Sequence, residues 1–264
     1  VNLEYSDLSD ALDFYEIPRI EKINEHVVLF VRHPIDQRMG LYTTTFAMVL
    51  TPDYFITICP QRSHIVESFL RQPPRYFSFE KPQLLIHTLL KITQNYTLEI
   101  KKIRTNVLKQ EKKMSSVDSR DITALTLNEE NLNQYLSSLV PMRTVLEAIT
   151  SGRYTFLYEK EQDLLEDLRN ASLQSEELCS INIRSISSLR DSYQILFTNQ
   201  LNKTIKMLTA LTIILSVPTM IASLYGMNVP LPFESQAHSF TFILAFLVMI
   251  SGGLLFLFHR KRWF

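Results

Sequence analysis

Two long apolar runs near the end of the chain dominate its pattern of hydrophobic and polar positions. Residues 207–233 and 235–258 contain no charged side chain, apart from a proton that His238 can hold. Each run exceeds the roughly 20 residues that a helix needs to cross a hydrocarbon core of about 30 Å. Gly252 and Gly253 lie inside the second run, where membrane helices tolerate glycine. We therefore predict two membrane-spanning helices; the alternative is a pair of buried core helices.

The charges that flank the two runs predict their orientation. Lys203 and Lys206 precede the first run, and residues 259–262 (His-Arg-Lys-Arg) follow the second, whereas the connecting loop has neither lysine nor arginine. Because cytosolic flanks are enriched in these two residues, we predict a multi-pass protein of the cell membrane with both ends in the cytosol. Trp263 and Phe264 then lie where aromatic side chains anchor a span at the interface.

The first 160 residues have the pattern of a cytosolic α/β domain. Short runs rich in β-branched and aromatic residues alternate with longer runs of helical periodicity. A polar break is expected at 115–121, and Pro141 is expected to kink the helix around it. Strands are predicted at 26–35, 41–50 and 54–59, and helices at 62–71, 82–114 and 128–149.

A single long helix is predicted from Glu161 to Tyr225. Glycine is absent between Arg153 and Tyr225, and Pro218 is the only proline there. One helix of this length spans roughly 100 Å and would link a cytosolic sensor to the membrane part. The alternative is two helices broken near 170–175. The apolar positions that recur at sums of three and four are Leu164, Leu168, Leu178, Ile181, Leu189, Tyr193 and Leu196.

Composition argues against several other classes of protein. The chain has 27 basic and 27 acidic residues, whereas a nucleic-acid-binding protein usually has a basic excess. Cys59 and Cys179 stand far apart and are interpreted as reduced thiols. The sequence shows no glycine-rich phosphate loop, no Ser/His/Asp arrangement and no histidine cluster with zinc spacing, so we do not expect an enzyme.

The loop between the spans holds candidate ion-binding groups. One helical hairpin cannot enclose a polar path, so a pore requires several copies of the chain around a symmetry axis. Mg²⁺ gives up its water reluctantly, and a ring of Asn228 amide oxygens would accept hydrogen bonds from that water. Gly226 would relax the backbone so that the helix ends; the alternative is a simple helix stop with a polar cap. Glu234, the only charge in the loop, would attract cations, or would only keep the loop soluble.

The end of the first span resembles the signature of the CorA family of divalent-cation transporters. The residues that carry the resemblance are Tyr225-Gly226-Met227-Asn228, preceded by a span over 208–228 that is similar along its length. The approach to it, Ser188-Leu-Arg-Asp-Ser-Tyr to Asn202-Lys-Thr, and the basic-aromatic tail at 259–264 are also similar. The likeness covers nearly the whole chain, is weakest before residue 60, and implies that the start is truncated.

The resemblance implies a homopentameric channel whose first span lines the pore. Gly226, Met227 and Asn228 then form the outer selectivity filter. The other pore-facing positions are Thr219, Ser216, Thr212, Leu208, Ile205 and Asn202, with a hydrophobic constriction at Leu208 and Ile205 and an acidic ring of Asp191 at the cytosolic opening. Serine at 216, where family members often have a bulky apolar group, argues against a second narrowing. The implied parts are a cytosolic α/β domain with a helical lobe (1–160), a stalk helix (161–204), two transmembrane helices (205–225 and 239–258), an outer loop (226–238) and a basic tail (259–264).

The resemblance also implies a regulatory Mg²⁺ between neighbouring subunits. The motif comparison places its carboxylates at Asp167 and Asp10. Two carboxylates across an interface repel each other until a cation bridges them, so occupancy would control subunit packing. The alternative for each residue is a solvated surface position.

Three functions remain open. The first is transport of Mg²⁺, with Co²⁺ and Ni²⁺ as further substrates, driven by a membrane potential that supplies about 4.6 kcal/mol per 100 mV for a divalent ion. The second is zinc transport by the same architecture, although the chain lacks clustered soft ligands. The third is a membrane-anchored scaffold or sensor without a pore, in which a polar face on the first span would have no use.

Overall fold

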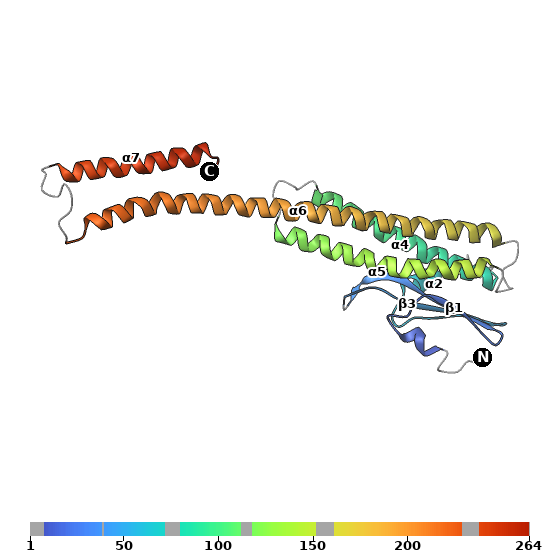
Figure 1. Cartoon of the computed structure of the whole chain (residues 1–264). Coiled ribbons are helices and arrows are strands. Elements are labelled where there is room, and N and C mark those ends of the chain that lie inside the picture. Colours follow the sequence, from blue (N-terminus) through green and yellow to red (C-terminus); the bar gives the residue numbers. More distant parts are fainter. Residues whose placement is uncertain are drawn as a thin grey trace. The chain divides into compact units, whose positions relative to one another are not determined.

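The computed structural model describes residues 8–38, 40–71, 80–111, 118–151, 161–228 and 238–263. The chain divides into two compact units, Val1–Asp191 (unit 1) and Ser192–Phe264 (unit 2). Helix α6 (Gln162–Tyr225) contributes to both units (Figure 1). The prediction of one continuous helix is therefore confirmed, and a break near 170–175 is excluded.

Unit 1 contains a four-stranded antiparallel sheet in the order β1-β2-β3-β4. Its strands are β1 (Arg19–Ile23), β2 (His26–Arg38), β3 (Leu41–Leu50) and β4 (Phe55–Ile58). The predicted set lacked β1, whose mixed sequence Arg-Ile-Glu-Lys-Ile has no clear apolar alternation. Strand β2 also continues past the predicted end, because a shift in register between Pro34 and Arg38 accommodates the proline.

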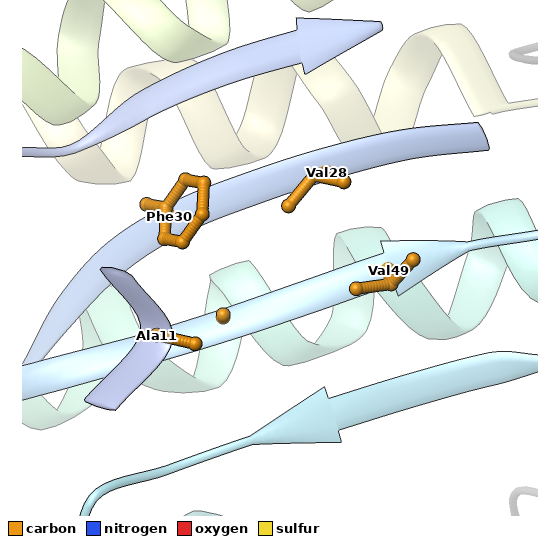
Figure 2. Close-up of a cluster of buried hydrophobic side chains, with 5 residues drawn as sticks. Ala11, Val28, Phe30 and Val49 are labelled. Carbon is orange, nitrogen blue, oxygen red and sulfur yellow. The ribbon is translucent and has the colours of Figure 1, made fainter. Parts of the chain in front are cut away.

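Strand β2 is buried on both faces. On one face, Val28 and Phe30 pack with Val49 of β3 against Ala11 of the short helix η1 (Asp10–Leu12), as Figure 2 shows. The opposite face contacts the helices α4 (Lys81–Glu111) and α5 (Ser119–Thr150). Burial on both sides explains why the β2 sequence is a continuous apolar run instead of an alternating one.

The helices of unit 1 match the predicted pattern at most boundaries. Helix α2 (His64–Arg71) and α4 lie close to the predicted ranges. The predicted start of the next helix at residue 128 is wrong, because α5 begins at Ser119. Asp118 caps it, and its backbone N–H donates to Asp121 Oδ2 at 3.0 Å. This capping box extends the helix into a polar stretch that the apolar pattern does not mark.

The part of α6 in unit 1 packs against α4 and α5 along a strict heptad seam. Ser175 Oγ lies 2.6 Å from Thr97 Oγ1 of α4, and Cys179 Sγ donates to the Leu132 carbonyl of α5 at 3.1 Å. Of the predicted apolar stripe, Leu168 and Tyr193 are fully buried, whereas Ile181 is exposed. The sequence prediction considered only apolar residues and therefore missed the buried polar residues Ser172, Ser175 and Asn182. The buried positions are Leu165, Leu168, Ser172, Ser175, Cys179, Asn182, Ile186 and Tyr193.

Unit 2 comprises the remainder of α6 and helix α7 (Ser239–Arg260). Each of the two helices contains a stretch long and apolar enough to cross a membrane, and almost none of either stretch is buried within the chain. Buried core helices would be covered by other parts of the protein, so that alternative is excluded for these segments. Both cysteines of the chain are free, Cys179 buried and Cys59 half-buried.

Candidate ion pathway and regulatory carboxylates

The residues predicted to face a pore lie on one side of α6 in unit 2. The spacing of the six residues, three or four positions, keeps them within about a third of the helix circumference. All six are exposed in the single chain, and Ile205 and Leu208 are about half exposed. Polarity distinguishes this side, because the remaining surface of the apolar part of α6 consists mainly of leucine, isoleucine, valine, methionine and alanine. The six residues are Asn202, Ile205, Leu208, Thr212, Ser216 and Thr219.

The threonines on this side bond to their own helix. Thr212 Oγ1 donates to the Leu208 carbonyl at 2.9 Å, and Thr219 Oγ1 donates to the Leu215 carbonyl at 2.7 Å. A hydroxyl that donates to the carbonyl four residues earlier has its hydrogen bonded even in an apolar environment. Its oxygen lone pairs remain free to accept hydrogen bonds. The two threonines therefore present acceptors, which suits hydrated cations better than anions.

Helix α6 ends at the predicted motif. The Gly226 N–H donates to the carbonyls of Ala222 at 3.1 Å and Ser223 at 3.2 Å, and the Met227 N–H donates to Leu224 at 3.3 Å. Gly226 does not adopt the left-handed conformation that usually explains glycine after a helix. A Cβ atom there would lie 3.4 Å from the Ser223 carbonyl oxygen, an ordinary contact. The backbone of a single chain therefore does not require glycine at 226.

Asn228 follows immediately and is exposed. Within the described part of the chain, no hydrogen bond engages its side-chain amide. The amide is therefore available to groups outside the chain. Glu234, the predicted outer collar, lies outside the described residues.

Asp191, predicted at the cytosolic opening, is the last residue of unit 1. Its side chain is 65% exposed and lies 3.9 Å from Arg190 Nε. Arg190 itself makes a close ion pair with Glu129 of α5. The arginine is therefore already neutralised by Glu129, and Asp191 keeps most of its charge toward solvent.

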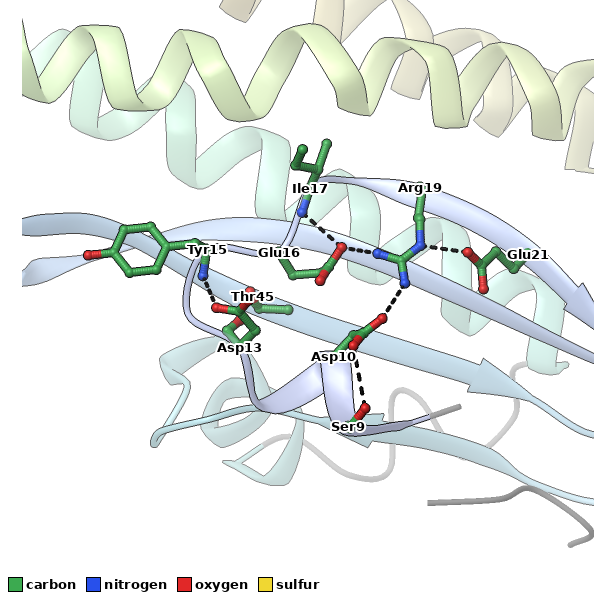
Figure 3. Close-up of polar contacts among 9 residues, drawn as sticks. All are labelled: Ser9, Asp10, Asp13, Tyr15, Glu16, Ile17, Arg19, Glu21 and Thr45. Carbon is green, nitrogen blue, oxygen red and sulfur yellow. Dashed lines mark hydrogen bonds and ion pairs between the residues drawn. The ribbon is translucent and has the colours of Figure 1, made fainter. Parts of the chain in front are cut away.

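Asp10, one predicted regulatory carboxylate, is already paired in the structure. Asp10 Oδ2 lies 2.7 Å from Arg19 Nη2, and Arg19 also contacts Glu16 closely and Glu21 at 2.6 Å (Figure 3). The guanidinium carbon lies 4.2 Å from the centre of the Phe30 ring. Hydrogen bonds to Glu21 and Asp10 raise the pKa of Arg19, against the effect of its partial burial. Arg19 therefore stays charged and leaves this cluster of three carboxylates with a net charge of −2.

The prediction from sequence missed Arg19. The signal was present, because Arg19 is the only basic residue among the first 21, which contain six acidic ones. A single cation in such a segment is the natural partner of several carboxylates, whichever way the chain folds locally.

Asp167, the other predicted regulatory carboxylate, is exposed on α6. Asp10 belongs to η1 on the face of the sheet that lies opposite α4 and α5, whereas α6 packs against those two helices (Figure 1). One chain therefore does not bring the two carboxylates together. Among the residues that the structure describes, no group of three or more His, Cys, Asp or Glu side chains is placed to hold a metal ion.

Comparison with known structures supports the fold assignment. The complete structure of the CorA magnesium transporter from Methanocaldococcus jannaschii matches with a TM-score of 0.82 and 23% identity, covering 99% of this chain and 84% of that one. The cytoplasmic domain of ZntB from Vibrio parahaemolyticus matches with a TM-score of 0.63 and 9% identity, covering 75% of this chain and 80% of that one. At these identities the likeness concerns the fold. The complete CorA structure matches the α/β unit, the long helix and the second apolar helix, as predicted, whereas the ZntB match is to a cytoplasmic domain alone.

Sequence comparison identifies the family. The cobalt/magnesium transport protein CorA of M. jannaschii is 24% identical over 274 aligned residues, which cover all of this chain and 85% of that protein. The family model for the CorA-like Mg²⁺ transporter protein matches residues 1–260. The chain therefore belongs to the family of CorA-like Mg²⁺ transporter proteins, whose function is divalent-cation transport across membranes and not enzymatic catalysis.

Proposed function

We propose that the chain is the subunit of a homopentameric Mg²⁺ channel of the cell membrane, with Co²⁺ and Ni²⁺ as further substrates. Both ends of the chain lie in the cytosol, and the membrane potential drives the ion inward. One observation supports this most directly: the apolar part of α6 has a polar side, and that side ends at Gly226, Met227 and Asn228. A membrane anchor without a pore would have no use for this side, since polar groups facing lipid are unfavourable.

The chemistry of the polar side suits a hydrated magnesium ion. Mg²⁺ holds its first-shell water tightly, and the hydrogens of that water point outward as strong donors. Five copies of the Asn228 amide oxygen would accept those hydrogens at the outer end. Thr212 and Thr219 continue the row, since their hydroxyl hydrogens are used within the helix and their lone pairs are free. The ion would pass along acceptors without losing its water.

Leu208 and Ile205 form the proposed gate. Five copies of each would surround the axis with branched apolar side chains, and a narrow apolar ring closes a pore by excluding water. Ser216 is too small to make a second ring of this kind. Asn202 and then Asp191 follow toward the cytosol, where exposed carboxylates would favour cations leaving the pore. Glu234 is proposed to act likewise at the outer mouth.

Asp10 and Asp167 form the proposed regulatory site between neighbouring subunits. They lie on different layers of one unit 1, so only two copies can bring them together. Mg²⁺ bound between them would hold the subunits in a closed arrangement, and loss of the ion would release them. Because Asp10 is paired with Arg19, a regulatory ion has to compete with the guanidinium for this carboxylate.

The proposed function is tested by ion flux in proteoliposomes loaded with a magnesium-sensitive dye, under an inside-negative potential. We expect Mg²⁺ entry with the parent chain and almost none with Asn228→Ala. Asn170→Ala is the matched control, because Asn170 is an exposed asparagine of α6 within unit 1, and it should retain parental flux. Zinc uptake that follows a proton gradient would instead support a zinc transporter. A parent without flux of any divalent ion would support the membrane-anchored scaffold.

A further inference from the structure

The C-terminal end of α7 closes in an unusual turn. The Trp263 N–H donates to the Phe258 carbonyl at 3.1 Å, and the Arg262 N–H donates to His259 at 3.0 Å. Arg262 has a φ of 55°, in the left-handed region. The rings of Trp263 and Phe258 pack with their centres 5.1 Å apart. Bonds of this pattern, with an apolar contact across the turn, define a Schellman motif.

An arginine occupies the position at which such a motif normally has glycine. A left-handed conformation costs free energy for any residue with a Cβ atom, and glycine avoids that cost. The turn itself is therefore no reason for arginine at 262. Strained backbone conformations are often found where the side chain has a function.

The turn leaves three consecutive cations on the surface. Arg260, Lys261 and Arg262 are all exposed, and none of them has an ion pair with a residue that the structure describes. The helix dipole favours cations near a C terminus. However, the carbonyls of Leu257, Phe258 and His259 already accept backbone N–H groups; the Leu257 carbonyl accepts that of Lys261 at 3.0 Å. The three side chains are therefore free to bind an external anion.

Unit 2 as a whole lacks an internal counter-ion at this end. Its basic residues are these three together with Lys203 and Lys206, which precede the apolar stretch of α6, and its only acidic residue is Glu234. Two spans joined by one short loop have their other ends, away from the loop, on the same side of the membrane. All five cations therefore gather on one membrane face, and Glu234 belongs to the loop on the other.

From this arrangement, we propose that Arg260, Lys261 and Arg262 bind the phosphate group of an anionic phospholipid at the end of α7. The Trp263–Phe258 contact holds the turn, and the indole lies at the depth of the headgroups, where tryptophan is favoured. Lys203 and Lys206 add to the positive field at the same face, which attracts anionic lipid. The proposal rests on the membrane topology of the proposed function and not on ion conduction.

Trp263 provides the readout, because it is the only tryptophan in the chain. The full chain is reconstituted into vesicles that contain equal mole fractions of either brominated phosphatidylglycerol or brominated phosphatidylcholine, both of which quench a nearby indole. We expect phosphatidylglycerol to be enriched around Trp263 by about fivefold, which corresponds to the attraction of one basic residue to an anionic surface. Added salt should reduce this preference.

Two variants separate charge from fold. In the triple variant Arg260→Gln/Lys261→Gln/Arg262→Gln, the two brominated lipids should quench the fluorescence of Trp263 equally. Arg262→Gly keeps the left-handed turn without strain and removes one charge, so it should reduce the preference while the emission maximum of Trp263 stays unchanged. Arg120→Gln, a 93% exposed cation of unit 1, is the control and should behave as the parent.

Several results would overturn the proposal. Equal quenching of the parent by the two lipids, or a preference that survives the triple substitution, would exclude an anionic lipid site. A response of Trp263 to inorganic phosphate in vesicles of phosphatidylcholine alone would assign the cations to free phosphate. Loss of subunit assembly in the triple variant, without any lipid preference in the parent, would assign them to an acidic surface of another copy. Flux recorded in the same vesicles reports the proposed function separately.

Discussion

Helix α6 is one helix in two environments, and its two parts use polar residues in opposite ways. In unit 1 the buried seam contains Ser172, Ser175 and Asn182, and the exposed surface carries the charges. In unit 2 the polar residues form one side of a helix that buries almost nothing within the chain. The same helix is therefore part of a helical bundle at one end and largely exposed at the other.

The difference shows where each part obtains its stability. The seam in unit 1 is completed by its own chain, through Thr97–Ser175, Arg104–Asn182 at 3.4 Å and Arg143–Glu176 at 3.2 Å. Among the described residues of unit 2, Thr212 and Thr219 bond to carbonyls of their own helix, and most of the large apolar side chains are exposed. Unit 2 therefore gains little stability from its own chain and is expected to depend on its surroundings in the membrane, whereas the buried seam of unit 1 is formed by contacts within one chain.

The largest expected contrast comes from the same substitution made in the two parts of α6. Leu168→Ala removes a fully buried side chain from the seam and should destabilise unit 1 by about 2–5 kcal/mol. Leu215→Ala alters a 61% exposed side chain and should cost less than about 1 kcal/mol. The measurement is urea-dependent labelling of Cys179, which is buried in the seam, in a Cys59→Ser background. Equal shifts in the labelling midpoint would mean that the exposed part of α6 contributes as much to the stability of the seam as the buried part does.

Unit 1 should also become less stable in acid, through His33. Burial lowers the pKa of His33 to about 4, and the nearby His64 adds to this effect. The unfolded chain binds the proton near pH 6.5, so stability should fall as the pH drops from 6.5 toward 4 and then level off. The full loss is about 3 kcal/mol. Urea unfolding followed by circular dichroism over this pH range measures it.

Replacement of the imidazole tests whether His33 is responsible. His33→Leu should remove most of the pH-dependent loss between 6.5 and 4, and a smaller part should remain because burial also lowers the pKa of His64. His238→Gln, at the exposed start of α7 in unit 2, should leave the loss unchanged. A pH-dependent loss of undiminished size in His33→Leu would place its origin elsewhere.

A smaller effect is expected from the polar half of the seam. Thr97→Ala and Ser175→Ala each remove one partner of the 2.6 Å hydroxyl contact between α4 and α6 and should cost about 1 kcal/mol. The double variant should cost less than the sum, because the second substitution no longer breaks a bond. Thr105→Ala is the control, since Thr105 is exposed on α4 and bonds only within its helix. Strict additivity in urea unfolding would show that the contact contributes nothing.

Sequence alone predicted the features that depend on long patterns. The two spans follow from the absence of charge over 207–233 and 235–258, and the single helix α6 follows from the absence of glycine between Arg153 and Tyr225. Features that depend on local bonds were missed. The start of α5 depends on the Asp118–Asp121 capping box, and β1 depends on pairing with an already buried neighbour.

The candidate site divides in the same way. The helix end at Tyr225 was predicted from the sequence, whereas the row from Asn202 to Thr219 was implied by the resemblance to the family and remains a prediction. Arg19 was missed although it is the only cation among the many carboxylates of the N-terminal segment, because Asp10 of η1, Glu16, and Glu21 of β1 do not form a recognisable motif. No single chain can form the proposed ring of Asn228, since a ring requires other copies.

The smallest expected effect links unit 1 to the ion pathway. Arg19→Gln should let Mg²⁺ bind Asp10 without competition and leave Glu16 and Glu21 uncompensated beside it. The ion pair is partly exposed and is therefore worth less than about 1 kcal/mol. The Mg²⁺ concentration that half-closes the channel should fall by up to about fivefold. Dye-based flux at a series of cytosolic Mg²⁺ concentrations measures this shift.

Arg71→Gln is the matched control, because Arg71 is 80% exposed and lies 3.7 Å from Glu67, far along the chain from the Asp10 cluster. It should leave the half-closing concentration unchanged. Asp10→Asn should raise that concentration, since it removes a proposed ligand. If Arg19→Gln also raises it, the guanidinium positions Asp10 for the ion instead of competing with it. The direction of the shift thus decides whether Arg19 positions the Asp10 carboxylate for Mg²⁺ or competes with Mg²⁺ for it.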